Sequence, residues 1–395
     1  MSEQYVKGHT SEQVKKLLKK GVIIPNSETV DIGEEVDVKR ISGNGVVLYS
    51  GCKILGKSTL ILQNSKIGFE GPVTLDNCFI GPAVDLKGGF FKKAVFLKNS
   101  SMGSGAHVRE GTILEEEAGG AHTVGLKQTI LFPFVTLGSL INFCDCFMSG
   151  GTSRKDHSEV GSSYIHFNYT PNQDKATPSL IGDVPRGVML DQRPVFLGGQ
   201  GGLVGPCRLA FGTVVSAGSI CRKDETRENR LIIQSAVKSC NIPFSPGRYQ
   251  NNKKILHNNI IYIANLIALR EWYLHIRSMF VSDNFPDALL LGLNENIELA
   301  LDERVKRLKE VCLKIPGSDF YILWPKIEEL LDNKKYHKGD TALRDNFLEK
   351  IYSIILQTGK NYISVIKNIE TADKAKGTAW LQGIVDNITF GINVL

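Results

Sequence analysis

The chain has 395 residues, of which 42% are apolar and 22% charged, a composition typical of a folded chain with more than one core. Its 47 basic and 41 acidic residues give a net charge of +6 and are spread along the whole length, which argues against a concentrated cationic surface for nucleic acid. The opening stretch is polar and no run reaches the ~18 apolar residues of a membrane span, so we expect a cytoplasmic protein that binds neither membrane nor nucleic acid.

The first predicted element is an amphipathic helix from Ser11 to Lys20. Val14, Leu17 and Leu18 lie among lysines at helical spacing. A stack of short strands has open ends, and such a helix closes one of them. We therefore predict an N-terminal helical cap over residues 1–29.

A six-residue repeat follows, in a region from about Val30 to Asp224 that is rich in Gly, Val, Ile and Leu. Apolar residues recur at every sixth position in two stretches: Met102, Val108 and Leu114, then Leu197, Leu203, Leu209, Val215 and Cys221. Small residues recur in the same register, four places later: Ala106, Thr112 and Ala118, then Gly201, Cys207, Thr213 and Ser219. A period of six suits a short strand, a tight turn and a return to the same inward position, and it suits neither a helix nor a hairpin. The sequence thus predicts a parallel β-helix over residues 30–245.

After Pro243 the pattern becomes helical. Apolar residues recur at helical spacing, and Pro286 and the pair Pro316-Gly317 punctuate the stretches. The helical segments that we expect are Asn251 to Phe280, Asp287 to Lys314, Ser318 to Leu331 and Asp345 to Ile369. This part, residues 246–395, is predicted to be an α-helical bundle and contains no catalytic motif.

The eight cysteines form no C-x2-C pair, which is the usual spacing of zinc ligands. Cys144 and Cys146 are two residues apart, so that a strand would place both on one face, but the neighbourhood offers no further ligands. We expect reduced, mostly buried thiols and no metal.

The most distinctive local motif runs from Val160 to Tyr169 and is followed by Lys175 and by Ile181-Gly182-Asp183. It resembles a stretch of the bacterial bifunctional N-acetylglucosamine-1-phosphate uridyltransferase and glucosamine-1-phosphate acetyltransferase that reads I-G-A-G-T-I-T-C-N-Y, then a lysine and I-G-D. Phe196 to Asp224 is similar to the last coils of that family without a gap. The resemblance implies a left-handed β-helix of the hexapeptide-repeat acyltransferases, acetyl-coenzyme A as co-substrate, and a homotrimer with sites between neighbouring subunits.

The same resemblance implies roles for individual residues. His157 follows the basic pair Arg154-Lys155 as the family's general base follows its lysines, and His166 is the rival base, facing outward if Ile165 points inward. Tyr169 would lie beside the reacting group. The residues implied in substrate binding are Arg154, Lys155, Asn168 and Lys175, and those implied in coenzyme A binding are Gly199, Ala217 and Arg222.

Three departures from the family accompany these assignments. Fewer residues separate His157 from Asn168 than in the family, and extra residues stand between Asp183 and Phe196. Together these differences indicate that one coil has been rebuilt. Gly199 replaces a serine. His122 would border a cleft between subunits, although nothing else in the sequence supports it.

Two functions are compatible with these patterns. The first is acyl transfer from coenzyme A to an amine of a sugar phosphate or nucleotide sugar, related to UDP-N-acetylglucosamine biosynthesis. The sequence contains no glycine-rich nucleotide loop, so we expect no uridyltransferase domain. The alternative is a non-catalytic trimeric scaffold or a nucleotide-sugar-binding protein.

Overall fold

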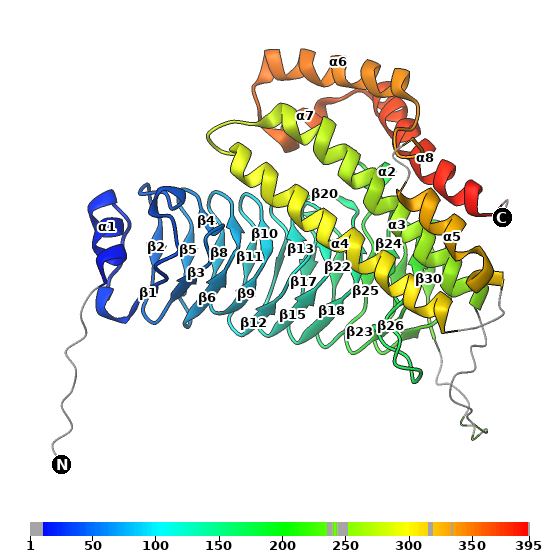
Figure 1. The fold of residues 1–395 in the computed structure, drawn as a ribbon, viewed down its shortest axis with the longest axis horizontal. Helices are drawn as coiled ribbons and strands as arrows, with labels where there is room; N and C mark the ends of the chain where they lie inside the picture. Colours follow the sequence, from blue (N-terminus) through cyan, green and yellow to red (C-terminus); the bar gives the residue numbers. More distant parts are fainter. Residues whose placement is uncertain are drawn as a thin grey trace.

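The computed structural model describes residues 11–234, 239, 241, 243, 252–314, 319–332 and 335–393. The chain winds into a parallel β-helix whose strands form three long sheets, and helices cover one of its sides (Figure 1). The predicted combination of a parallel β-helix and a following helical region is confirmed. The boundary predicted between residues 245 and 246 lies outside the described residues.

Within the described residues, the first and third sheets each contain ten strands and the second contains eight. Sheet 1 consists of β1 (Asp31–Ile32), β3 (Lys53–Leu55), β6 (Val73–Asp76), β9 (Gly89–Lys92), β12 (Ala106–Val108), β15 (Val124–Lys127), β18 (Ile141–Cys144), β23 (Ile165–Phe167), β26 (Gly202–Val204) and β29 (Ile220–Cys221). Sheet 2 consists of β4 (Leu60–Ile61), β7 (Phe79–Ile80), β10 (Ala94–Phe96), β13 (Thr112–Leu114), β16 (Ile130–Leu131), β19 (Cys146–Met148), β24 (Ser179–Ile181) and β27 (Arg208–Leu209). Sheet 3 consists of β2 (Val47–Leu48), β5 (Lys66–Ile67), β8 (Asp85–Leu86), β11 (Ser101–Met102), β14 (Gly119–Gly120), β17 (Thr136–Leu137), β22 (Glu159–Val160), β25 (Phe196–Leu197), β28 (Val214–Val215) and β30 (Leu231–Ile232).

The six-residue step sets the register of the stack. Phe196 pairs with Val214 in the next coil, so one coil is three steps long. All the apolar repeat residues that we predicted to point inward are buried: Met102, Val108, Leu114, Leu197, Leu203, Leu209, Val215 and Cys221. Stacking of neighbouring coils is what buries them, because a single coil has no core of its own.

The corner between sheets 2 and 3 takes a left-handed backbone conformation in successive coils. Its residues with positive φ are Asn64, Ala83, Asn99, Glu117 and Phe134. Such angles are uncommon for residues other than glycine, and asparagine tolerates them best. Two of these residues, Asn99 and Glu117, line a large cavity between the β-helix and the helices.

Helix α1 (Glu12–Lys20) lies at the first coil, and two 3₁₀ turns, η1 (Ser27–Thr29) and η2 (Val38–Arg40), follow it. Ser11 caps its first turn, and Gly21 ends it with a φ of 100°. Val14 and Leu17 are buried toward the coils as expected, whereas Leu18 is exposed.

The helical region lies on sheet 2. It consists of α3 (Asn252–His275), the 3₁₀ turn η3 (Arg277–Phe280), α4 (Asp287–Leu313), α5 (Asp319–Asp332), α6 (Thr341–Thr358), α7 (Tyr362–Asn368) and α8 (Thr371–Asn393). Helix α4 contacts β7, β10 and β13, and α3 contacts β24. Gly292 permits the close approach of α4 to β7, because a Cβ at this position would come within 2.4 Å of the Phe79 ring. Helices α6 and α8 form an outer layer over α3 (Figure 1).

Two expectations for this region need correction. The single helix expected from Asp345 to Ile369 is two helices, because the chain breaks at Gly359 with a φ of 81° and Asn361 caps α7. Helix α8 was not predicted at all. The predicted helix ends Asn251 and Ser318 lie outside the described residues. None of the helices in the described part of the chain combines the length and the apolar character that a membrane span needs.

Candidate functional site

The residues predicted to form the site are distributed over three corners of the β-helix. Arg154, Lys155 and His157 lie between sheets 2 and 3. The corner between sheets 3 and 1 carries Gly199 and Ala217. The corner between sheets 1 and 2 carries Asn168, Tyr169, Lys175 and Arg222. One chain therefore does not bring these residues together.

His157 lies on a hairpin that interrupts the regular coil. Strands β20 (Gly151–Ser153) and β21 (Asp156–His157) pair in the antiparallel sense, unlike the strands of the three sheets. The imidazole Nε2 is 3.9 Å from the Glu159 carboxylate, and the buried Nδ1 forms no hydrogen bond with a described residue. An imidazole beside a carboxylate is an arrangement that general bases use.

Arg154 fastens this hairpin to the preceding coils. Its Nη1 donates to the carbonyl oxygens of Glu117 and Phe134, each at 3.0 Å, and to the Thr136 hydroxyl at 2.9 Å. The guanidinium also borders a groove of about 500 Å³ over the strands β14 and β17. Lys155 is exposed at the tip of the hairpin. Arg154 thus has a structural role and still faces a groove that an anion can enter.

The structure corrects the expected orientation of His166. Ile165 points outward and His166 points inward, where 1% of the residue is exposed. Nδ1 lies 2.6 Å from the Cys144 carbonyl oxygen and Nε2 lies 2.8 Å from the Ser179 hydroxyl, so both ring nitrogens are occupied. Burial lowers the pKa of this imidazole to about 4. Most inward positions of the coils hold apolar residues. His166 is a polar exception, and nothing in the local sequence indicates that its side chain points inward.

Asn168 belongs to a network that joins the β-helix to the helical region. Its amide donates to the Asp145 carboxylate at 2.8 Å, and the other oxygen of Asp145 is 2.8 Å from the Arg304 guanidinium on α4. Arg304 also donates to the Lys175 carbonyl oxygen at 3.5 Å. These contacts therefore connect the loop that contains Asn168, Tyr169 and Lys175 to helix α4. Asp145 and Arg304 were missed by the sequence reasoning, because they are far apart along the chain and lie in no motif.

Tyr169 and Lys175 point away from this network. The tyrosine is 67% exposed, and Lys175 is also exposed. Exposed side chains of this size at one corner are available to a ligand or to another chain.

The corner with Gly199 and Ala217 is closely stacked. A Cβ on Gly198 would lie 2.3 Å from the Ala217 nitrogen, and one on Gly199 would lie 2.8 Å from the Ser162 carbonyl oxygen. The glycine that replaces the family's serine is thus accounted for by close packing with the preceding coil. Ala217 is exposed, and so is Arg222, whose guanidinium donates to the Ile220 carbonyl oxygen at 3.3 Å.

The extra residues between Asp183 and Phe196 dock the helical region. They include the short helix α2 (Val184–Gly187), which contacts α3 and α8. The Val184 amide donates to the Asn265 side chain of α3 at 2.9 Å, and Lys374 of α8 donates to the Met189 carbonyl oxygen at 2.9 Å. The rebuilt coil therefore supplies attachment points for helices.

The cysteines do not form a metal site within the described residues, where no group of three or more His, Cys, Asp or Glu side chains is placed to hold an ion. Cys144 ends β18 and Cys146 begins β19, so a corner separates them and they do not share the face of one strand. The described cysteines are all free, and Cys240 lies outside the described residues.

No family model matches the chain. Several curated proteins do match it, among them bifunctional GlmU proteins from three different bacteria. The chain is 28% identical over 213 residues to that of Thermotoga maritima, a match that covers 54% of this chain and 42% of the relative. The corresponding values are 25% over 232 residues for Nitratidesulfovibrio vulgaris, covering 57% and 44%, and 27% over 260 residues for Baumannia cicadellinicola, covering 64% and 48%.

The resemblance to GlmU is confirmed. The matched stretch spans less than half the length of each of these GlmU proteins. Together with the parallel β-helix, the similarity agrees with the hexapeptide-repeat acetyltransferase half that the motifs indicated.

Proposed function

We propose that this protein is a cytoplasmic transferase that moves an acetyl or other acyl group from coenzyme A to an amino group of a sugar phosphate or nucleotide sugar. The observation that carries the proposal is the similarity to GlmU proteins over more than half of the chain, in a chain that folds as a parallel β-helix.

In the proposed reaction the amine attacks the thioester carbonyl, a C–N bond forms, and the C–S bond breaks. His157 accepts the proton that the amine loses, and the coenzyme A thiolate leaves and is protonated. The Glu159 carboxylate, 3.9 Å from Nε2 of His157, supports this role. Backbone N–H groups would stabilise the oxyanion.

The proposal requires more than one copy of the chain. The three corners that carry the candidate residues face different directions, and a homotrimer would bring the corner of one chain to that of its neighbour. In this arrangement Gly199, Ala217 and Arg222 hold coenzyme A, and Arg154, Lys155, Asn168, Tyr169 and Lys175 hold the acceptor.

The first test is a thermal melt with acetyl-coenzyme A. Ligand at ~100 times its dissociation constant is expected to add roughly 2.7 kcal/mol of stability. If saturating acetyl-coenzyme A does not shift the melting temperature, the enzyme hypothesis is contradicted. The alternative of a scaffold or nucleotide-sugar-binding protein then remains.

The second test measures acetyl transfer to glucosamine 1-phosphate by mass spectrometry. His157→Asn is expected to lose about 10²–10⁴-fold in rate, the usual contribution of a general base. His107→Asn is the matched control, because His107 is an exposed histidine on the outer face of sheet 1, away from all three candidate corners. Equal rates in the two variants would remove His157 from the mechanism.

A further inference from the structure

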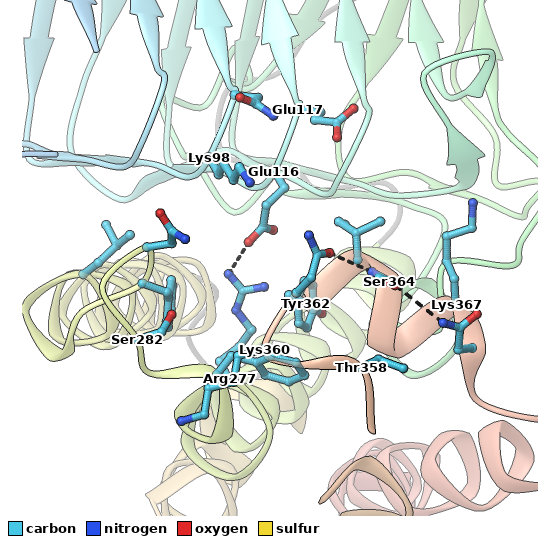
Figure 2. Close-up of a pocket in the computed structure, with 18 residues that line it drawn as sticks. Lys98, Glu116, Glu117, Arg277, Ser282, Thr358, Lys360, Tyr362, Ser364 and Lys367 are labelled. Atoms are coloured by element: carbon cyan, nitrogen blue, oxygen red, sulfur yellow. Dashed lines mark hydrogen bonds and ion pairs between the residues drawn. The ribbon is translucent and has the colours of Figure 1, made fainter. Parts of the chain in front are cut away.

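A large cavity lies where the β-helix meets the helical region, away from His157. It has a volume of about 660 Å³. The corner between sheets 2 and 3 contributes Lys98, Glu116 and Glu117 to one wall, and Arg277 and Lys367 lie on the opposite side (Figure 2). Cavities of this size commonly hold small organic ligands.

Arg277 is the most unusual group in this cavity. Only 1% of the residue is exposed, and its guanidinium lies 3.8 Å from the centre of the Tyr362 ring and 4.7 Å from that of Phe285. Nη2 donates to the Glu116 carboxylate at 2.6 Å, whereas Nε and Nη1 form no hydrogen bond with a described residue. Buried donors without acceptors are costly, and an acceptor supplied by a ligand would satisfy them.

The charge around the cavity favours an anion. Among the described residues, four cationic side chains line it, Lys98, Arg277, Lys360 and Lys367, against the carboxylates of Glu116 and Glu117. Glu116 is paired with Arg277. The ammonium groups of Lys98 and Lys367 form no hydrogen bond or ion pair with any described side chain and remain available.

Apolar groups complete the lining. Phe280 packs edge to face against Tyr362, with the ring centres 5.2 Å apart, and Leu289 and Ile363 also line the cavity. A ligand that matches both features carries a dianion at one end and an apolar or ring-shaped body at the other. A phosphate monoester neutralises several cations at once, whereas a single carboxylate carries only one charge.

We propose that this cavity binds an organic phosphate, with the phosphate group attracted by the positive charges of Lys98, Arg277 and Lys367, and the body of the ligand against Phe280 and Tyr362. The site is independent of the proposed acyl transfer, since none of the residues assigned to that reaction lines the cavity. It does adjoin the groove of Arg154, because Asn99 and Glu117 line both.

The experiment is isothermal titration of the full-length protein with uridine monophosphate and glucose 1-phosphate, each beside its uncharged parent, uridine or glucose, and with inorganic phosphate. We expect at least one phosphate ester to bind, its parent not to bind, and inorganic phosphate to bind more weakly. The affinity should fall as salt rises. Failure of both esters to bind, or inorganic phosphate binding as tightly as the better ester, would overturn the proposal.

Variants then locate the site. Lys98→Gln and Lys367→Gln, both at exposed positions, are each expected to weaken binding about tenfold, the effect of losing one charge-assisted contact. Lys57→Gln is the matched control, since Lys57 is an exposed lysine at a different corner, between β3 and β4, and does not line the cavity. Binding that is lost in Arg154→Gln but unchanged in the Lys98 and Lys367 variants would place the phosphate in the neighbouring groove and refute the inference. That outcome would not affect the acetyl-coenzyme A melt, so the two proposals fail separately.

Discussion

Replacing Arg304 with methionine is expected to destabilise the protein and to loosen the loop of Asn168. The guanidinium and the Asp145 carboxylate are 2.8 Å apart, and their side chains are only 2% and 5% exposed. Methionine preserves much of the packing of the arginine stem. It leaves the Asp145 carboxylate buried, and the side-chain partner that remains to it in the described part of the chain is the Asn168 amide at 2.8 Å.

The cost follows from this burial. Removing one partner of a buried pair typically costs about 3–5 kcal/mol, because the other charge stays in a medium that solvates it poorly. Arg307 on the same helix provides the control, since its pairs with Glu303 and Glu310 are partly exposed. Pairs of that kind are worth about 0.2–1 kcal/mol, so Arg307→Met should have a small effect.

The assay is urea denaturation followed by circular dichroism, with hydrogen exchange to find where protection is lost. We expect Arg304→Met to lower the midpoint more than Arg307→Met and to speed exchange around Asn168. The double variant Arg304→Met with Asp145→Asn should recover part of the loss, because no charge is then left unpaired. If the two single arginine variants have equal midpoints, the buried pair does not tie the loop to α4.

Three further outcomes are expected. Burial lowers the pKa of His166 from 6.5 in the unfolded chain to about 4 in the folded chain. The stability that the neutral imidazole contributes is therefore full above pH 6.5 and is lost as the pH falls toward 4. His166→Gln should reduce the pH dependence of the urea midpoint between pH 4 and 6.5. Burial raises the pKa of Glu115 from 4.5 to about 7. Its contribution to folding stability is therefore full below pH 4.5 and is lost as the pH rises through 7. Glu115→Gln should raise the melting temperature relative to wild type at pH 8 but not at pH 4. Val214→Glu should lower the assembled mass in analytical ultracentrifugation if exposed sheet 3 forms the proposed trimer contact, whereas an unchanged mass would exclude this contact.

The β-helix could be predicted from the sequence because its signal is local and repeated. Leu197, Leu203 and Leu209 hold the inward position of three successive strands, and six residues suffice to recognise the step. The helices α3 and α4 could also be predicted, since their apolar residues recur at helical spacing over more than twenty positions.

Contacts between distant segments could not be predicted. The sequence of α8 contains Gly377, Gly383 and Gly391 and gave no clear helical pattern, yet Gly377 lets the helix approach Met189 and Phe347 closely. The direction of His166 depends on Ser179 and the Cys144 carbonyl, which lie on other strands. The formation of α8 and the direction of the His166 side chain thus depend on contacts between distant segments, which the local sequence pattern does not show.

The position of the helices limits how copies of the chain can meet. Helices α3 and α4 occupy sheet 2, so an assembly through the β-helix has to use sheets 1 and 3. Apolar side chains are exposed on these two sheets near the last coils: Ile165 on sheet 1, and Phe196, Val214 and Leu231 in neighbouring register on sheet 3. The corner between the same two sheets carries Gly199 and Ala217. The surface available for assembly and the corner assigned to coenzyme A are therefore adjacent, which is the arrangement that a site shared between subunits requires.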